Sequence, residues 1–344
     1  MIVEAIARLV EGHSLTRQEA AAAMEDIMED RATPAQFGAF VTALRLKGET
    51  PDEIAGMAEV MRRKALRVPT DLPVVDTCGT GGDGSGSFNV STAAAFVVAA
   101  TGQPVAKHGN RGMSSACGSA DVLEALGASV TLGPEAVARC IDETGFGFMF
   151  AQVYHPAMKF AAPLRREIGI RTVFNVLGPL TNPAGAKVQV LGAPSAAAQE
   201  RLAGALAQLG TERALVVHGL EGLDEVSIAG PTRVLDVGAE GVDEYEVHPE
   251  QFGLRPAAAE AVRGGTAAEN AAIVRAVLSG AADESSAGAA RRDIVALNAA
   301  AALVACGRAP DLTAGVQLAQ DVLHSGEALT RLDAFVRLSQ SLSN

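Results

Sequence analysis

The residues most suited to chemistry lie between residues 76 and 127, in a stretch dense in glycine, serine and asparagine. A β-branched run at residues 72–77 leads into a glycine-rich loop at 79–86, and Asn89 then opens an alanine- and valine-rich stretch with good N-cap chemistry. A strand, a glycine loop and a helix N-terminus aim backbone N–H groups and a partial positive charge at one place, which suits an anion. The stretch therefore predicts a phosphate-binding site.

A second apolar run, residues 103–106, is followed by two cationic residues, Lys107 and Arg111, which are expected to lie beside this loop. Lys107 and Arg111 at a strand end in an acidic chain are suited to hold a pyrophosphate. His108 between them is either a hydrogen-bonded loop histidine or an aromatic wall for a second substrate. Ser91 and Thr92 are either capping hydroxyls or contacts to a phosphate or a metal.

The loop at 79–84 also satisfies the Gly-x-Gly-x-x-Gly pattern of dinucleotide-binding folds. Such a site needs an acidic residue roughly 20 positions further on to hold the ribose hydroxyls, and this chain has Lys107 and His108 at the end of its second strand. Asp83 lies inside the loop, where its carboxylate repels a pyrophosphate unless a divalent cation or a ribose hydroxyl lies between them. The residues favour a metal-bound phosphoribosyl or nucleotide-like ligand.

Charged pairs occur at two further places in the chain. Asp224 and Glu225 follow the apolar run 214–217 at another predicted strand end, where hard oxygen ligands suit Mg²⁺. The alternative is a solvated turn, in which such pairs are common. Arg165 and Arg166 form a basic pair in a helical stretch, which by itself is typical of an exposed helix face.

Several long motifs resemble the anthranilate phosphoribosyltransferases, a family of tryptophan biosynthesis. The matching motifs lie at residues 79–83, 89–92, 107–111, 114–115, 118–121, 171–183, 218–219, 222–227 and 230–232. The resemblance covers nearly the whole chain. It implies transfer of the phosphoribosyl group from phosphoribosyl pyrophosphate (PRPP) to the amine of anthranilate, with Mg²⁺ as cofactor.

The resemblance also implies the site residues. PRPP is assigned to Gly79, Gly82, Asp83, Ser87, Asn89, Val90, Ser91, Thr92, Lys107, His108, Gly109, Asn110, Arg111, Gly112, Met113, Ser114, Ser115 and Ser119. Anthranilate is assigned to Gly79, His108, Asn110 and Arg165, and Mg²⁺ to Ser91, Asp224 and Glu225. Because the arylamine is neutral at physiological pH, its attack needs positioning more than deprotonation, and no residue is assigned as a general base.

Two other functions stay open on the sequence alone. Pyrimidine nucleoside phosphorylases share the implied architecture and also bind phosphate and a pentose, but segments 107–111 and 175–183 resemble the transferase. The second alternative is a catalytically silent relative that binds nucleic acid. A formal net charge of −12 disfavours it, as it disfavours binding to anionic membranes, because such surfaces demand Lys and Arg in excess.

The rest of the composition indicates a globular protein of the cytoplasm. No window is long and apolar enough to span a membrane, and the first residues lack the pattern of a signal peptide. The four cysteines have no Cys-x-x-Cys spacing, which predicts reduced residues and not a zinc site or a disulfide framework.

The fold class predicted is α/β. The site must be positioned by two parts of this fold, a small helical domain and a larger domain built on a sheet. Residues 1–66 read as amphipathic helices with capping boxes that start at Thr16, Thr33 and Thr50. Two prolines near residue 70 predict a boundary between a small α-helical domain, 1–70, joined by part of 163–185, and a larger α/β domain, 71–344. The apolar helix face is either a bundle core or the seam of a homodimer. Its members are Ile6, Leu9, Phe37, Phe40, Val41, Leu44 and Met57.

Beyond residue 70, apolar runs alternate with helical stretches, which predicts a central, mostly parallel or mixed sheet flanked by helices. The runs expected as strands are 72–77, 103–106, 128–131, 147–150, 187–192 and 213–218, with further strands in 226–247 and helices from 266 to 342. Ligands should collect at the carboxyl ends of the parallel strands.

Overall fold

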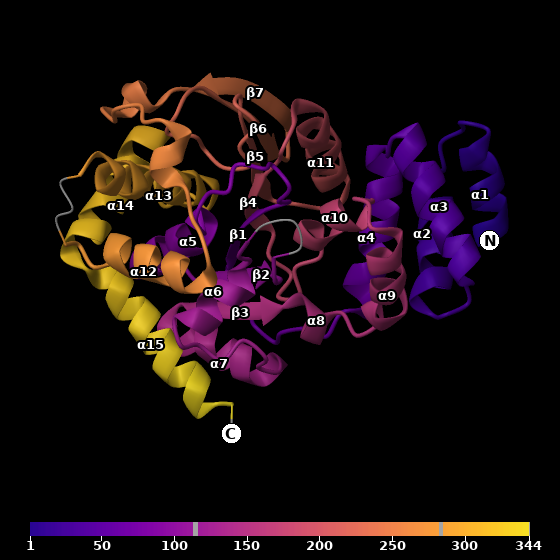
Figure 1. Cartoon of the computed structure of the whole chain (residues 1–344), viewed down its shortest axis with the longest axis horizontal. Coiled ribbons are helices and arrows are strands. Elements are labelled where there is room, and N and C mark those ends of the chain that lie inside the picture. The colour runs from indigo at the N-terminus through magenta and orange to yellow at the C-terminus, as the bar shows by residue number, and fades with distance from the viewer. Residues whose placement is uncertain (113–115, 282–284, 344) are drawn as a thin grey trace.

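The structure is a computed structural model, and it describes residues 1–112, 116–281 and 285–343. Two lobes follow one another along the chain (Figure 1). The first is a bundle of helices at the N-terminal end, and the second is a sheet covered by helices on both faces. No helix among the described residues is long and apolar enough to cross a membrane.

The helical lobe begins with four helices whose starts are fixed by local sequence. They are α1 (Ile2–Val10), α2 (Arg17–Met28), α3 (Pro34–Lys47) and α4 (Pro51–Lys64). The three predicted capping boxes, at Thr16, Thr33 and Thr50, are all present, and proline opens both α3 and α4. The chain returns to this lobe later through α9 (Met158–Ile168) and α10 (Phe174–Leu177), whose buried Phe174 stacks on Phe37 of α3.

The predicted apolar face of the helical lobe forms its core. Leu9, Phe37, Phe40, Val41, Leu44 and Met57 are buried, and Ile6 is half-buried. Other apolar side chains of this lobe face outward. Val3, Val10 and Leu46 are 57 %, 72 % and 82 % exposed, whereas the predicted face is used for the core of the lobe.

The second lobe is built on a seven-stranded sheet with the order β3-β2-β1-β4-β5-β6-β7. Its strands are β1 (Val75–Gly79), β2 (Val105–Gly109), β3 (Phe146–Phe150), β4 (Val188–Gly192), β5 (Arg213–Gly219), β6 (Thr232–Gly238) and β7 (Gly241–Val247). The first five are parallel, and β6 and β7 add an antiparallel edge. The predicted mostly parallel, mixed sheet is confirmed.

One predicted strand is wrong. Residues 128–131 form an irregular connection between α6 (Ser119–Ala125) and α7 (Pro134–Thr144). The apolar Val130 is buried, but the backbone N–H of Ser129 donates to Ser339 Oγ on the last helix at 3.0 Å, not to a neighbouring strand. A buried position beneath a helix therefore explains the apolar run. The β1 and β2 strands also start later than expected, because each run contains a proline, Pro73 or Pro104, which cannot donate to a ladder.

The remaining helices cover the sheet. They are α5 (Val90–Ala100), α8 (Ala151–Tyr154), α11 (Ala196–Gln208), α12 (Ala267–Leu278), α13 (Ser286–Ala305), α14 (Leu312–Ser325) and α15 (Glu327–Ser341), with short 3-10 turns at Gly178–Leu180, Pro249–Phe252 and Ala259–Val262. The α5 helix is almost wholly buried. The register aligns Gly79 of β1 with Gly192 of β4, and Gly109 of β2 with Phe150 of β3. The carboxyl ends of these four strands therefore lie at the same end of the sheet.

Candidate active site

Glycine is required where β1 and β4 end, because the loop that carries Asp224 packs directly on them. A Cβ on Gly79 would lie 2.4 Å from Asp224 Oδ2, and a Cβ on Gly192 would lie 1.6 Å from the backbone oxygen of Asp224. Real side chains do not reach such separations. The two strand ends therefore bring an acidic loop into contact with the glycine loop, although Asp224 and Gly81 are 143 residues apart in sequence.

The acidic pair holds both parts of the predicted phosphate site. Asp224 Oδ2 accepts a hydrogen bond from the backbone N–H of Gly81 at 2.7 Å, and Glu225 Oε1 accepts one from the N–H of Ser91 at 3.1 Å. The two residues are only 8 % and 9 % exposed. The alternative of a solvated turn is therefore wrong for this pair.

Asn89 is the N-cap residue of α5, as its sequence position predicts, but its side chain makes no capping bond. Instead, its Nδ2 donates to the carbonyl of Cys117 at 3.2 Å, and its Oδ1 accepts from Asn270 at 2.9 Å. The Glu225 carboxyl accepts from the Ser91 N–H at this helix N-terminus in its place.

Burial and like charge act together on these carboxyls. Burial and the neighbouring Asp83 raise the pKa of Asp224 to about 7. Burial and the adjacent Asp224 also raise the pKa of Glu225. A cluster of this kind is relieved by a cation, since a divalent ion removes the like-charge repulsion.

The donor atoms around the loop fit a hard divalent cation such as Mg²⁺. Asp83 Oδ2, Thr80 Oγ1 and Thr92 Oγ1 are buried and have no hydrogen-bond partner within the described part of the chain. No group of three or more His, Cys, Asp or Glu side chains among those same residues is arranged as a ready-made metal cage. Mg²⁺ is commonly held by one or two carboxylates, with waters and substrate phosphates as its other ligands, so the buried carboxyls of Asp224 and Glu225 suit it.

Lys107 lies in the middle of β2, and not at its end as the sequence predicts. It is 1 % exposed, and its Nζ donates to the carbonyl of Thr77 and, at 3.2 Å, to Ser91 Oγ. Its charge opposes the effect of burial on Asp76, whose pKa is still raised to about 6. The lysine therefore places a buried cation directly beneath the start of α5.

Arg111 is held away from the glycine loop. Its guanidinium donates to Asp121 of α6 at 3.0 Å, also pairs with Glu124, and lies 5.4 Å from the ring centroid of Phe150. The N–H groups of Gly112 and Gly118 donate to Asp121. The predicted contacts at Met113, Ser114 and Ser115 lie outside the described residues, so the pyrophosphate role of this segment stays a prediction.

The other residues predicted for PRPP make local contacts. Ser87 Oγ lies 3.3 Å from Ser85 Oγ in the glycine loop, and Ser119 Oγ donates to the carbonyl of Asn110 at 3.4 Å. The Asn110 side chain accepts from the N–H of Arg111 at 2.8 Å. The Val90 side chain is buried at the start of α5, and its contact with PRPP stays a prediction.

The residues predicted for the second substrate include two groups with reduced basicity. His108 is buried, its Nδ1 lies 3.0 Å from the carbonyl of Gly178, and its ring centroid is 5.0 Å from that of His155. Burial and His155 lower the pKa of His108 to about 3, so the ring is neutral. Arg165 lies on α9 with its guanidinium carbon 5.2 Å from the ring centroid of Phe174, and burial lowers its pKa.

Sequence reasoning missed Arg171 as a site residue, although the residue opens one of the motifs. Its Nη2 donates to the carbonyls of Gly81 and Thr80 at 2.8 and 3.3 Å. The signal available from the sequence was only its place in the motif 171–183, because a single arginine after a helix has no spacing that predicts a loop contact.

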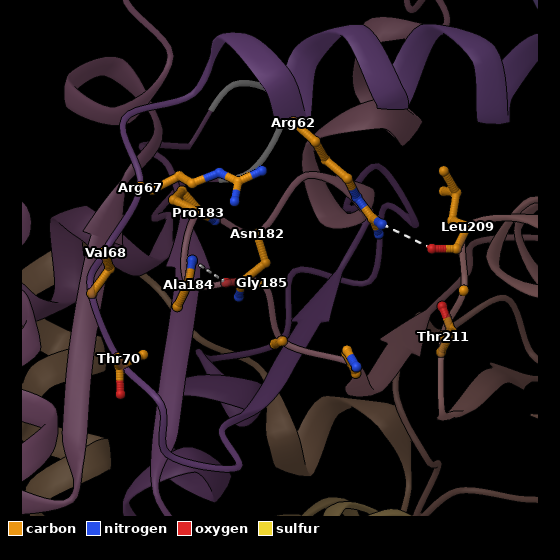
Figure 2. Close-up of a pocket in the computed structure, with 13 residues that line it drawn as sticks. Arg62, Arg67, Val68, Thr70, Asn182, Pro183, Ala184, Gly185, Leu209 and Thr211 are labelled. Atoms are coloured by element: carbon orange, nitrogen blue, oxygen red, sulfur yellow. Dashed lines mark hydrogen bonds between the residues drawn. The ribbon is translucent and has the colours of Figure 1, made fainter.

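A separate hollow, of about 340 Å³, lies at the opposite end of the sheet from the glycine loop (Figure 2). Arg62, Arg67 and the loops 182–187 and 209–211 line it. These loops immediately precede β4 and β5, so the hollow is at the amino ends of the parallel strands. It is distinct from the site built by the glycine loop and the acidic pair.

Comparison with known proteins agrees with the two-lobe description. Residues 71–329 match the model of the glycosyl transferase family a/b domain, and residues 3–65 match the helical bundle domain of the same family. A curated anthranilate phosphoribosyltransferase from Roseiflexus sp. (strain RS-1) is 57 % identical over 340 residues, 98 % of each chain. One from Dehalococcoides mccartyi (strain CBDB1) is 51 % identical over 346 residues, 100 % of each chain.

Solved structures resemble the chain along its whole length. The anthranilate phosphoribosyltransferase from Thermus thermophilus is 48 % identical with a TM-score of 0.90, covering 98 % of this chain and 99 % of that one. The enzyme from Saccharomyces cerevisiae in complex with PRPP and Mg is 28 % identical with a TM-score of 0.89, covering 99 % and 98 %. The yeast enzyme is also known in complex with 4-fluoroanthranilate.

Proposed function

Because the chain belongs to the anthranilate phosphoribosyltransferases, we propose that it transfers the 5-phosphoribosyl group of PRPP to the amine of anthranilate. The products are N-(5-phosphoribosyl)anthranilate and pyrophosphate, in the second step of tryptophan biosynthesis from chorismate. A bond forms between the amine nitrogen and C1 of the ribose, the bond from C1 to the pyrophosphate oxygen breaks, and the amine loses a proton. The observation that carries this proposal is the acidic pair that holds the glycine loop at Gly81 and the α5 start at Ser91.

The donor half of the site stabilises a leaving pyrophosphate. As positive charge grows on the ribose, the departing anion needs fixed donors that do not reorganise. Glycine-loop N–H groups other than that of Gly81, the positive end of the α5 helix dipole and the buried Lys107 supply them. When bound, Mg²⁺ neutralises the pyrophosphate; Asp224, Glu225 and the Ser91 hydroxyl would hold it. Asp83 contacts the ribose or the metal's water shell.

The remaining predicted PRPP contacts complete this half of the proposal. They come from the glycine loop and the segment after β2: Gly79, Gly82, Ser87, Asn89, Val90, Thr92, His108, Gly109, Asn110, Arg111, Gly112, Met113, Ser114, Ser115 and Ser119. Arg111 must exchange its ion pairs with Asp121 and Glu124 for the substrate. The exchange is feasible because these are exposed pairs, which contribute little stability.

The acceptor half of the site positions anthranilate and does not activate it. The Arg165 guanidinium pairs with the carboxylate of anthranilate, since a planar fork suits bidentate pairing. Asn110 and Gly79 place the ring and the amine. His108, with its pKa lowered to about 3, is neutral and serves as a wall for the ring, not as an acid. No strong base is needed, because the arylamine is neutral and attack is limited by orientation.

Assembly and organisation extend the proposal. The exposed Val3, Val10 and Leu46 on α1 and α3 support a homodimer formed through the helical lobe, because a second subunit would cover apolar side chains that this lobe leaves in water. We propose functional units of 1–70 with part of 163–185, and of 71–344; the stacking of Phe174 in α10 on Phe37 in α3 supports assigning part of 163–185 to the first unit. The four free cysteines support a reducing, cytoplasmic location.

A fluorescence assay tests the proposed reaction. Anthranilate fluorescence should fall when PRPP is added with Mg²⁺, with one pyrophosphate released per anthranilate consumed, and should not fall when Mg²⁺ is chelated. Thymidine with phosphate is the matched control for the phosphorylase alternative. Release of thymine without loss of anthranilate would contradict the proposal.

A further inference from the structure

The segment between α9 and α10 carries one side chain from the helical lobe to the glycine loop. Both flanking helices pack on the helical lobe: α9, with the buried Ala161, contacts α2 and α3, and Phe174 of α10 stacks on Phe37. Between them, the half-buried Arg171 reaches the other lobe, and its Nη2 donates to the carbonyl of Gly81 at 2.8 Å and to that of Thr80 at 3.3 Å. The contact therefore joins the two lobes at the loop that receives the donor.

Gly81 is held by opposite charges on its two polar groups. Its N–H donates to the Asp224 carboxylate, and its carbonyl accepts from the Arg171 guanidinium. Hydrogen bonds to charged partners are stronger than those between neutral groups. Burial lowers the pKa of Arg171, and the negative charges of Asp224 and Asp83 oppose that effect. The loop is thus held between an acidic residue of one lobe and a basic residue from the other.

The Arg171 guanidinium fits against the loop only because residue 82 has no side chain. Gly82 has a φ of +77°, which disfavours other residues, and a Cβ built there would lie 1.5 Å from Arg171 Nη1. Any side chain at residue 82 must displace the guanidinium. Gly82 is therefore required both for the turn and for the close approach of Arg171.

We propose that Arg171 is a positioning residue for the donor substrate. It holds Gly81 so that the N–H groups of the glycine loop are arranged to receive the pyrophosphate of PRPP, and it ties this loop to the segment that begins with α9 and Arg165. The inference rests on the proposed reaction and adds a residue outside the implied donor and acceptor sets. Because Arg171 contacts the loop backbone, its loss should weaken PRPP binding and leave the anthranilate contact in place.

The test compares Arg171→Met with Arg171→Lys, and uses Arg166→Met as the matched control from the exposed helix end. Loss of charge-assisted hydrogen bonds predicts a roughly ten- to hundredfold rise in both the KM and the calorimetric Kd for Mg²⁺–PRPP in Arg171→Met. The KM for anthranilate should change by less than about threefold. Arg171→Lys should recover part of the loss, and Arg166→Met should behave like the wild type.

A double-mutant cycle with Gly82→Ala separates positioning from general destabilisation. Gly82→Ala should weaken PRPP binding in the wild type, because it expels the guanidinium, and should cost less in the Arg171→Met background. PRPP constants within twofold of wild type in Arg171→Met, or an additive cycle, would overturn the inference. If Arg171→Met does not fold, Arg171→Lys and Gly82→Ala carry the test, and unchanged PRPP binding in both overturns it. Failure of the wild type to consume anthranilate would refute the proposed function instead.

Discussion

Replacing Asp224 by asparagine should stabilise the metal-free protein at alkaline pH. The wild-type carboxyl is buried beside Asp83, and together burial and that neighbour raise its pKa from 3.8 to about 7. Asparagine keeps the volume and an oxygen that can accept from the Gly81 N–H. It also removes one of two adjacent negative charges, so the variant avoids a cost that the wild type carries for its metal site.

The sign and size of the effect follow from linkage. The folded carboxyl binds its proton more tightly than the unfolded one, so its contribution to stability is fully present below pH 4 and is lost as the pH rises through about 7. Between pH 5 and pH 7 the unfolded carboxyl is ionised while the folded one is protonated. Two pH units at about 1.36 kcal/mol each therefore remove about 3 kcal/mol of unfolding free energy from the wild type.

Urea unfolding in the presence of a chelator measures this difference at pH 5, 6, 7 and 8. The unfolding free energy of Asp224→Asn minus that of the wild type should increase by about 3 kcal/mol from pH 5 to pH 8. Asp142→Asn, at an exposed position on α7, is the control and should follow the wild type. Parallel pH profiles for wild type and Asp224→Asn would refute the electrostatic reasoning.

Two further predictions concern the acceptor and the assembly. Arg165→Ala should lower kcat/KM for anthranilate roughly ten- to hundredfold and change that for PRPP far less, with partial recovery in Arg165→Lys and none of this in Arg166→Ala. Steady-state kinetics in which each substrate is varied in turn measure this. An effect of Arg165→Ala on PRPP alone would show that the assignment of Arg165 to anthranilate is wrong. Leu46→Asp with Val10→Asp should convert a dimer to a monomer in light scattering, because both side chains are exposed on the helical lobe. A wild type that is monomeric across micromolar concentrations contradicts the proposed dimer.

Local signals in the sequence predicted much of the fold. Capping boxes at Thr16, Thr33 and Thr50 act within three or four residues, so their outcome does not depend on the rest of the chain. The alternation of apolar runs and helical stretches likewise predicted the central sheet. The run 128–131 failed because an apolar segment beneath a helix and one in a strand have the same composition, and only the Ser129 contact with α15 distinguishes them.

The site was predictable in its parts and not in its connections. The pattern places the glycine loop and the acidic pair at strand ends that face the same ligand, but nothing local shows that Asp224 accepts from the Gly81 N–H or that Glu225, not Asn89, accepts from the Ser91 N–H. The pattern places Lys107 at a strand end, and nothing local shows that it lies within β2, buried, with its Nζ donating to the Thr77 carbonyl and to Ser91 Oγ.

The most direct test of the account is a Mg²⁺ titration of PRPP-dependent anthranilate consumption, performed on the wild type and on Asp224→Asn combined with Glu225→Gln. Both replacements preserve volume and remove hard anionic ligands, so the variant should need more Mg²⁺ and reach a lower rate, while its circular dichroism stays that of the wild type. If the titration and the rate of the variant match those of the wild type, the acidic pair does not hold the metal and the proposed donor site is wrong.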